Sequence, residues 1–556
     1  MVKINPYSIF KISFFICFLF VLHITPSYSD GIGLYLPNNI LLWAFVSIWI
    51  GLGFWNIHRT RILKFSRFSI TIFLGFVLLF IPLVYQSEYV YELTYLKFFG
   101  IIAIFFLYLA LLQIKPEKSN NYWFYYIVIY SVLIKSVFEL ISYFFPHFLS
   151  ALRLDQYLFN TLNQRNIQST FLIMGPILSL LIFLKNSELV KLFNYKKVIL
   201  FSCTFLASIM LMILQSRTAL ISLPIATLFI FIANYKYNKN IIIWFTLTIS
   251  GLLVGYILIN NMPANSNIKR TEELKQYSIK ARLDTYKISY NIWQDNPLEG
   301  CGYGYFLSSF RDYYAKEKKI NPNIIKLGGE NVLHPHNEFL FWLVEGGVIP
   351  LFGLITILLS FVGMLWKTKL KESLTYIGCL FPIFFHTQLE YPFYNSTIHI
   401  ILFCFLIYKA DQEYGIHYTI KNKFKFLPIL LAYSIPFISI IYLASVLQTG
   451  LIITKFEKTG YKDLTLLQKA LNPESMKKKY DNYVLKIHLN TAIRTINEEQ
   501  LKSYISTVEQ NIKHSPFMFL YYDLATAYQA LGNMDKAWTI YNKGKYLYPD
   551  VNWQDE

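Results

Sequence analysis

The chain has 556 residues, of which 55% are hydrophobic, 18% aromatic and 15% charged, a composition that excludes an ordinary soluble globular protein. Its formal net charge is +18. The basic residues lie in short loops between apolar runs, which favours a role in membrane topology over nucleic-acid binding. The five cysteines form no disulfide framework and no metal-ligand spacing, and no phosphate-binding or nucleotide motif is present. We therefore expect no nucleic-acid partner, no metal and no cofactor.

Long apolar runs predict a helical membrane protein. A helix needs about 20 apolar residues to cross roughly 30 Å of hydrocarbon. The expected fold class is therefore an all-α polytopic integral membrane protein with about thirteen transmembrane helices. The runs lie near 7–26, 38–57, 68–85, 93–114, 122–145, 169–185, 197–215, 218–234, 240–260, 337–365, 374–391, 393–408 and 426–449. The first run also resembles a secretory signal, with Lys3 before it and Ser27-Tyr28-Ser29 after it, and we favour its retention.

The basic residues also predict the orientation of the chain. One set of alternate short loops carries most of the lysines and arginines, whereas the other set contributes Arg153, Arg165 and Arg217. Since positive charge marks the cytoplasmic side, the first set is expected to be cytoplasmic. The segments expected outside are 27–37, 86–92, 146–168, 215–218, 261–336, 389–396 and everything after about 450.

Two of the expected outer segments are much longer than the others, namely 261–336 and the part of the chain after about residue 450. Loop 261–336 contains an amphipathic helix pattern from about Thr271 to Gln294, followed by a glycine-rich turn. We expect a membrane domain over residues 1–449 that includes this loop, and a soluble helical domain over residues 450–556.

The C-terminal domain carries one unit of a helical repeat. Met518–Val551 matches the spacing of a tetratricopeptide (TPR) unit. Because one repeat cannot bury its own apolar face, earlier helices at 463–471 and 498–511 are expected to stack on it. Such a domain most often offers a surface for protein contacts.

The strongest candidate for chemistry is His336, in the stretch ENVLHPHNEFLFWLVEGGVIP (330–350). It lies just before the predicted span 337–365 and two residues after His334, and Asn337 and Glu338 follow it at positions from which they could orient it. A lone histidine beside a membrane is more often structural, but this setting favours catalysis. Imidazole, with an unperturbed pKa of about 6.5, suits a general base.

Charged groups in other outer segments are candidates for binding an anionic substrate. Arg217 lies at the junction of two predicted spans, where arginine is costly unless it is paired. Arg282 lies on the amphipathic loop helix beside Asp284, and a solvated helix face explains it equally well. Arg165 is a third candidate, and Glu390 could pair with an arginine. Arginines can hold a diphosphate through bidentate hydrogen bonds.

These motifs resemble those of the O-antigen ligase superfamily. They occur in the order Ser-Arg-Thr, then Asn-Pro-Leu-Glu-Gly-Cys-Gly-Tyr-Gly, then His-Asn-Glu and Glu-Gly-Gly. The Asn-Gln-Arg-Asn segment, Leu-Glu-Tyr-Pro-Phe-Tyr and the C-terminal domain are more similar to its PglL-type branch. Those proteins are bacterial O-linked oligosaccharyltransferases that glycosylate pilins and other exported proteins. Each motif is weakly specific alone, and their order carries the resemblance.

The resemblance implies an activity and a location. The donor would be an oligosaccharide on undecaprenyl diphosphate, transferred en bloc to a hydroxyl of an exported protein. The chain would lie in the bacterial inner membrane, with its active site and C-terminal domain in the periplasm. His336 would be catalytic, and Arg217 and Arg282 would bind the donor diphosphate without a divalent metal.

The resemblance also implies supporting roles for several polar side chains. Gln164 and Tyr394 match positions linked to activity, although Tyr391 is an alternative match for Tyr394. Arg165 stands where many relatives have proline, which puts the detailed role of that loop in doubt.

The chemistry of such a transfer needs few groups. A polyprenyl diphosphate is already a good leaving group, so orientation, a base and charge stabilisation suffice. A single displacement then predicts inversion at the anomeric carbon. The alternatives are an O-antigen ligase with lipid A-core as acceptor, an O-antigen polymerase, and a transporter or flippase. The C-terminal domain favours a protein acceptor, and polar groups on one face disfavour transport.

Overall fold

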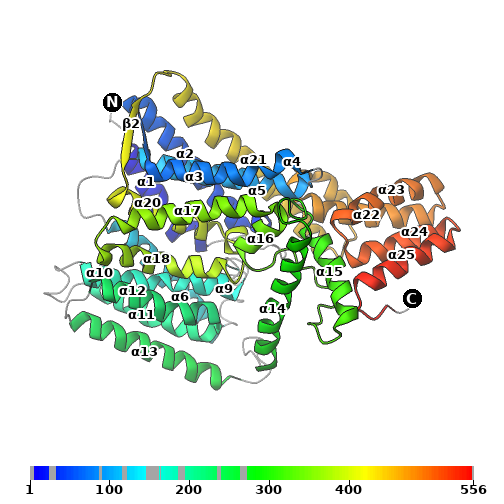
Figure 1. Ribbon diagram of the computed structural model, residues 1–556, viewed down its shortest axis with the longest axis horizontal. Coiled ribbons are helices and arrows are strands. Elements are labelled where there is room, and N and C mark those ends of the chain that lie inside the picture. Colours follow the sequence, from blue (N-terminus) through cyan, green and yellow to red (C-terminus); the bar gives the residue numbers. More distant parts are fainter. Residues whose placement is uncertain are drawn as a thin grey trace. The chain divides into compact units, whose positions relative to one another are not determined.

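The chain folds into two compact units, which are described separately. The first comprises residues 1–73, 102–270 and 357–472, and the second comprises 74–101, 271–356 and 473–556. The computed structural model describes residues 5–23, 33–86, 90–114, 122–145, 162, 164–185, 195–234, 239–262 and 272–553 (Figure 1). Three helices contribute residues to both units: α3 (Arg67–Phe80), α5 (Tyr91–Gln113) and α17 (Val348–Trp366).

The first unit consists mainly of long apolar helices. Its elements are α1 (Pro6–Leu19), η1 (Val21–His23), η2 (Gly33–Tyr35), α2 (Pro37–Thr60), β1 (Ile62–Ser66), α6 (Trp123–Phe144), α9 (Arg165–Leu172), α10 (Met174–Lys185), α11 (Tyr195–Leu214), α12 (Arg217–Asn234), α13 (Lys239–Asn260), α18 (Leu370–Thr387), α19 (Pro392–Asn395), α20 (Thr397–Tyr414), β2 (His417–Lys421), α21 (Leu427–Lys458) and η4 (Leu464–Lys469). Helix α2 packs on α21, and α12 packs on α18.

Small residues allow α13 to lie close alongside α11 (Figure 1). Gly251 and Gly255 are four residues apart on one face of α13. A Cβ atom would lie 2.6 Å from the carbonyl oxygen of Phe205 at Gly251, and 2.6 Å from that of Ile209 at Gly255. Such close backbone approach is typical of helix pairs in membranes, where packing rather than the hydrophobic effect drives association.

The number of apolar helices supports a polytopic membrane protein. Among the described residues, ten helices are long and apolar enough to cross a membrane, and Arg217–Ala233 is a shorter apolar helix. Helices α18 and α20 also match predicted spans, but α20 carries Lys409, Asp411 and Glu413. The exact number of thirteen therefore stays a prediction.

One pair of segments is not helical. Strands β1 and β2 form an antiparallel pair in which Ile62 faces Lys421 and Ser66 faces His417. Both strands come from loops that the sequence analysis predicts on the same, cytoplasmic side. The all-α prediction missed this pair because each strand is a short run of mixed character beside a long helix.

The second unit combines the large loop with the C-terminal helices. Its elements are α4 (Pro82–Tyr85), α14 (Glu272–Asp295), α15 (Phe306–Ile320), α16 (Glu338–Gly346), η5 (Pro473–Met476), α22 (Lys477–Arg494), α23 (Glu498–His514), α24 (Met518–Ala530) and α25 (Met534–Leu547). Helix α14 confirms the predicted amphipathic helix. Helices α22 to α25 lie side by side (Figure 1). Their apolar core includes Leu307 and Ala315 of α15, so the loop and the C-terminal helices share one core.

Two predicted helices differ in the structure. The predicted span 337–365 is broken at Gly347, whose φ of +76° ends α16 and precedes α17. The sequence pattern missed this break because apolar residues continue on both sides. The predicted helix 463–471 is the 3₁₀ helix η4, which packs on α21 in the first unit. Helix α22 packs on α23 and α24 instead. The α24–α25 hairpin fits the predicted tetratricopeptide unit in its bounds, and the family assignment of that unit stays a prediction.

Candidate functional site

The glycine-rich turn of the large loop packs against the Glu-Gly-Gly segment at the C-terminal end of α16. The backbone N–H of Cys301 donates to the carbonyl of Val344 at 2.8 Å. At Gly347, a Cβ atom would lie 2.0 Å from the carbonyl oxygen of Leu298, so only glycine fits this contact. The Asn-Pro-Leu-Glu-Gly-Cys-Gly-Tyr-Gly motif and the Glu-Gly-Gly motif thus contact each other through their backbones.

A buried ion pair lies beneath this contact. The ammonium of Lys97 lies 3.1 Å from Glu345, and the two side chains are 9% and 5% exposed. Glu345 also accepts the N–H of Gly304 at 3.0 Å. The Lys97 ammonium sits 3.7 Å from the ring centroid of Trp342, which adds a cation–π contact. Sequence analysis did not single out Lys97, because the apolar run around it predicts a span and its partner is distant in sequence.

His336 adopts a backbone conformation that is rare for residues other than glycine. Its φ is +61°, in the left-handed region. Hydrogen bonds hold it on both sides: its N–H donates to Nδ1 of His334 at 2.9 Å, and its carbonyl accepts from the Tyr286 hydroxyl at 3.3 Å. Asn337 begins α16 as its N-cap and accepts the N–H of Leu340 at 2.9 Å. The half-buried His336 side chain is therefore carried by a constrained backbone.

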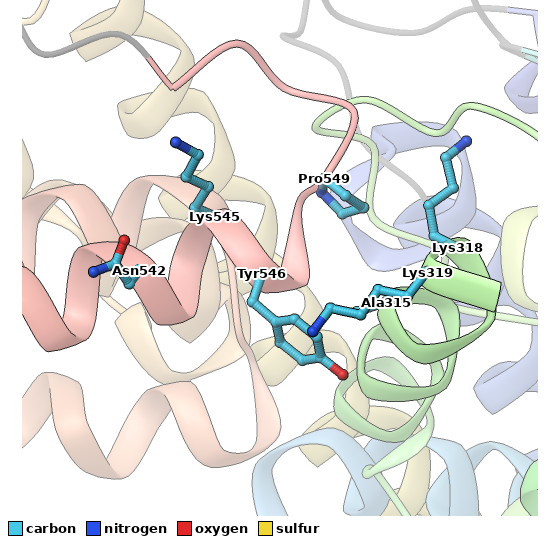
Figure 2. Close-up of a pocket in the computed structure, with 7 residues that line it drawn as sticks. All are labelled: Ala315, Lys318, Lys319, Asn542, Lys545, Tyr546 and Pro549. Atoms are coloured by element: carbon cyan, nitrogen blue, oxygen red, sulfur yellow. The ribbon is translucent and has the colours of Figure 1, made fainter. Parts of the chain in front are cut away.

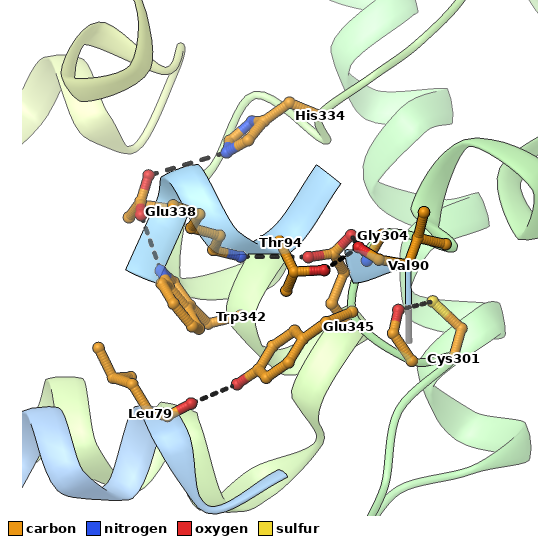
Figure 3. A network of polar contacts seen from close by, with 12 residues as sticks. Leu79, Val90, Thr94, Cys301, Gly304, His334, Glu338, Trp342 and Glu345 are labelled. Atoms are coloured by element: carbon orange, nitrogen blue, oxygen red, sulfur yellow. Dashed lines mark hydrogen bonds and ion pairs between the residues drawn. The ribbon is translucent and has the colours of Figure 1, made fainter. Parts of the chain in front are cut away.

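His334 is buried and neutral. Because its Nδ1 accepts the His336 N–H, its ring proton must be on Nε2. That nitrogen lies 3.7 Å from Glu338, which also accepts the Trp342 indole N–H at 2.8 Å (Figure 3). Burial lowers the pKa of His334 to about 4, although Glu338 opposes the shift. Burial would raise the pKa of Glu338, but the neighbouring His334 ring and the hydrogen bond from Trp342 hold that pKa below its usual value. Glu338 therefore supports His334, and through it His336.

Arg282 lies on helix α14, whose Tyr286 contacts the His336 backbone. Its Nη1 donates to Ser278 Oγ at 3.0 Å. Tyr286, which contacts the His336 carbonyl, is four residues further along and hence on the same helix face. The neighbouring Asp284 accepts the backbone N–H of Ile325 at 2.9 Å. The half-buried Arg282 thus belongs to the face of α14 that meets the histidine segment.

The C-terminal end of the chain holds the segment that leads to His336. Asp550 accepts the backbone N–H of Leu327 at 2.9 Å and lies 3.0 Å from the Lys318 ammonium. The Tyr548 hydroxyl lies 2.9 Å from Asn331 Oδ1. Residues 327 and 331 belong to the loop that ends at His336. Sequence analysis did not single out Asp550 and Tyr548, since they lie at the end of the repeat-like unit, after helix α25, and carry no motif of their own.

A second polar cluster lies in the first unit. Ser216 Oγ donates to Asn166 Oδ1 at 3.0 Å, and Asn166 Nδ2 donates to Glu390 at 3.1 Å. These bonds link residues of three segments that the sequence predicts on one face, namely 146–168, 215–218 and 389–396. Glu390 is buried and accepts a hydrogen bond from Asn166. Its pairing with an arginine stays a prediction.

The remaining predicted side chains of this unit surround the same cluster. Asn395 Nδ2 donates to Gln164 Oε1 at 3.2 Å. Burial raises the pKa of Tyr391, and Glu390 adds to the shift, while Gln164 hydrogen-bonds the hydroxyl. The backbone N–H of Tyr394 donates to the carbonyl of Tyr391 at 3.2 Å. The Tyr391 hydroxyl thus contacts Gln164, and the choice between the two tyrosines stays open.

Arg217 and Arg165 both begin helices. Arg217 is the first residue of α12 and Arg165 is the first residue of α9. Arg217 directly follows Ser216 of the polar cluster and is half-buried. Among the residues that the structure describes, no carboxylate pairs with Arg217. A guanidinium at a helix N-terminus, where backbone N–H groups also point outward, suits an anion.

The predicted site residues thus form two groups. His336, Asn337, Glu338 and Arg282 lie together in the second unit. Gln164, Arg165, Arg217, Glu390, Tyr391 and Tyr394 lie in or beside the polar cluster of the first unit. Within the described part of the chain, His, Cys, Asp and Glu form no group of three that could hold a metal ion.

The contact between the two histidines predicts unequal effects of two substitutions. His334→Asn keeps an acceptor near the position of Nδ1, whereas His334→Leu leaves the His336 N–H without one. Losing a buried acceptor costs about 1–3 kcal/mol, so we expect His334→Leu to lower kcat roughly tenfold to one-hundredfold. We expect His334→Asn to retain most of the activity. Equal activity of the two variants in a glycan-transfer assay would contradict this role of His334.

Burial of neutral His334 also predicts how stability depends on pH. The unfolded chain binds a proton near the ordinary histidine pKa of about 6.5, but folded His334 does so only at about 4. Between these values the unfolded state binds more protons, so the free energy of unfolding falls as the pH falls, by up to about 3 kcal/mol. We expect melting temperatures in detergent to fall between pH 6.5 and 4 and to fall less in His334→Asn. If the melting temperatures of the wild type and His334→Asn fall equally between pH 6.5 and 4, burial of neutral His334 does not cause the pH dependence.

Two matches to known families cover most of the candidate site residues and the C-terminal helices. Residues 202–378 match the family described as O-Antigen ligase. Residues 374–555 match the family described as virulence factor membrane-bound polymerase, C-terminal. No curated protein matches the chain significantly. The first match includes Arg217, Arg282 and the segment around His336, and the second includes Glu390 and the tail with Asp550.

Proposed function

Because this chain belongs to the O-antigen ligase superfamily, we propose that it is a PglL-type O-linked oligosaccharyltransferase. It transfers an oligosaccharide en bloc from undecaprenyl diphosphate to a serine or threonine hydroxyl of an exported, pilin-like protein. It does so at the periplasmic face of the bacterial inner membrane. The superfamily and the apolar helices support glycan transfer in a membrane, and the acceptor and orientation are the new parts of the proposal.

One observation carries the choice of a protein acceptor. The C-terminal helices share a core with α15 of the large loop, and Asp550 binds the backbone just before the histidine segment. An acceptor that binds the C-terminal helices would therefore be held on the same unit as His336. A lipid acceptor, which reaches the enzyme through the bilayer, gives no comparable reason for this arrangement.

Each group of residues has its own role in a single displacement at the anomeric carbon. His336 takes the proton of the acceptor hydroxyl as its oxygen attacks the anomeric carbon, and the bond to the diphosphate oxygen breaks. Arg217 and Arg282 offset the negative charge that builds on the departing diphosphate. His334 and Glu338 hold His336 through its backbone. Gln164, Tyr391 and the other polar groups of the first unit bind substrate.

Two other reactions have specific support. The description of the 202–378 match favours an O-antigen ligase, and that of the 374–555 match favours a polymerase. In a ligase the glycan would pass to lipid A-core. In a polymerase it would pass to a second lipid-linked glycan.

A competition assay separates these reactions. Purified protein is incubated with lipid-linked oligosaccharide and equimolar pilin and lipid A-core, and intact masses are recorded. We expect the mass of one oligosaccharide on pilin. Glycan found solely on lipid A-core would make the protein a ligase, and donors that grow by whole repeat units would make it a polymerase.

A further inference from the structure

An open pocket lies between α15 of the large loop and α25 of the C-terminal helices. It has a volume of about 330 Å³ and is lined by Ala315, Lys318, Lys319, Asn542, Lys545, Tyr546 and Pro549 (Figure 2). This volume falls in the lower part of the range of ligand pockets, about 300–1,000 Å³. None of the candidate catalytic residues lines it, so the pocket is separate from the site described above.

The pocket has an uncompensated positive charge. Lys318 is neutralised by Asp550 at 3.0 Å. Among the described residues, no carboxylate pairs with Lys319 or Lys545, and both are exposed. The Lys319 ammonium lies 4.4 Å from the ring centroid of Tyr546, so its charge is held over the pocket. The part of the chain that the structure describes therefore leaves two of the lysines lining this pocket without a carboxylate partner.

The remaining lining groups fit a polypeptide. Ala315, Tyr546 and Pro549 offer apolar surface, and the Asn542 amide can both donate to and accept from a peptide group. A simple phosphate would use the charges but not the apolar groups. An acidic peptide uses all three kinds of group at once.

We propose that this pocket is a docking site for an acidic segment of the acceptor protein, with Lys319 and Lys545 binding its carboxylates. The identity of the peptide as part of the acceptor rests on the proposed function. Since the pocket walls come from α15 and α25, a bound segment would contact both the loop that leads to His336 and the C-terminal helices. Docking would raise the local concentration of the acceptor hydroxyl without taking part in the chemistry.

Binding is tested on the full chain in detergent, without donor. The probes are a fluorescent peptide rich in glutamate and its glutamine counterpart. We expect the glutamate peptide to bind more tightly, with an affinity that falls as salt rises. Lys319→Glu combined with Lys545→Glu should weaken binding at least tenfold. Lys502→Glu, which reverses an exposed charge on α23, is the matched control and should change binding less than twofold.

Several outcomes would overturn the docking site. They are equal binding of the two peptides, unchanged binding by the double variant, and displacement of the peptide by millimolar inorganic phosphate as efficiently as by unlabelled peptide. Loss of binding to phosphatidylglycerol vesicles in the double variant, with peptide binding intact, would assign the pocket to lipid instead.

Transfer kinetics separate this inference from the proposed function. With an acidic acceptor, the double variant should raise KM about tenfold and leave kcat within twofold, because the chemical groups are untouched. If the double variant glycosylates pilin with the KM of the wild type, the docking site is contradicted and the proposed function is not. If the wild-type protein binds the peptide but glycosylates no protein, the proposed function is contradicted instead.

Discussion

His336→Asn is expected to lower kcat for glycan transfer by about 10²–10⁴-fold, the range typical of a lost general base. Asparagine suits this position because it tolerates the left-handed backbone that His336 adopts at φ +61°. The substitution thus removes the imidazole while the backbone bonds to His334 and Tyr286 remain. The measurement is the initial rate of transfer at saturating donor and acceptor.

Two controls separate catalysis from folding. His488→Asn changes an exposed histidine on α22 and should keep the wild-type rate. The melting temperature of His336→Asn should match that of the wild type. A folded His336→Asn protein with the wild-type kcat would remove His336 from the mechanism.

Glu345→Gln is expected to destabilise the protein by about 3–5 kcal/mol, because it leaves the Lys97 ammonium buried without its carboxylate. The pair is separated by 3.1 Å and almost fully buried. Glutamine keeps an acceptor for the Gly304 N–H, so the loss reports the charge rather than the hydrogen bond. Thermal unfolding in detergent measures the effect, and we expect activity to fall with it because α16 begins beside His336.

The charge explanation is checked by a second change. Lys97→Met combined with Glu345→Gln removes both charges and should recover most of the lost stability. Glu498→Gln breaks an exposed ion pair with Lys502 and should leave the melting temperature unchanged. If Glu345→Gln melts at the wild-type temperature, the buried pair does not stabilise this unit.

The sequence predicts those parts of the fold that follow from local pattern. Apolar runs predict the long helices, and the helical spacing of polar residues predicts each end of α14 to within one residue. The break at Gly347 was missed because it arises from contact with Leu298, about fifty residues away, in a run that stays apolar. The β1–β2 pair was missed for a similar reason, since each strand depends on a partner distant in sequence.

The candidate site also has a part that the sequence predicts and a part that only the structure shows. The sequence singles out His336, Arg217 and Arg282 because their residue types are unusual in their positions. It does not show that His334 accepts the His336 N–H, or that Asp550 binds Leu327. Both contacts use ordinary polar residues, and their roles become visible only once the loop and the C-terminal helices have folded together.

The configuration of the transferred sugar tests the central chemistry most directly. If His336 activates a hydroxyl for a single displacement, the anomeric carbon must invert relative to its bond to the lipid diphosphate. Nuclear magnetic resonance of the glycosylated product, compared with the intact donor, measures this. We predict inversion and no glycan mass on the enzyme itself. Retention of configuration, or a glycosyl-enzyme seen by intact mass, would contradict the mechanism.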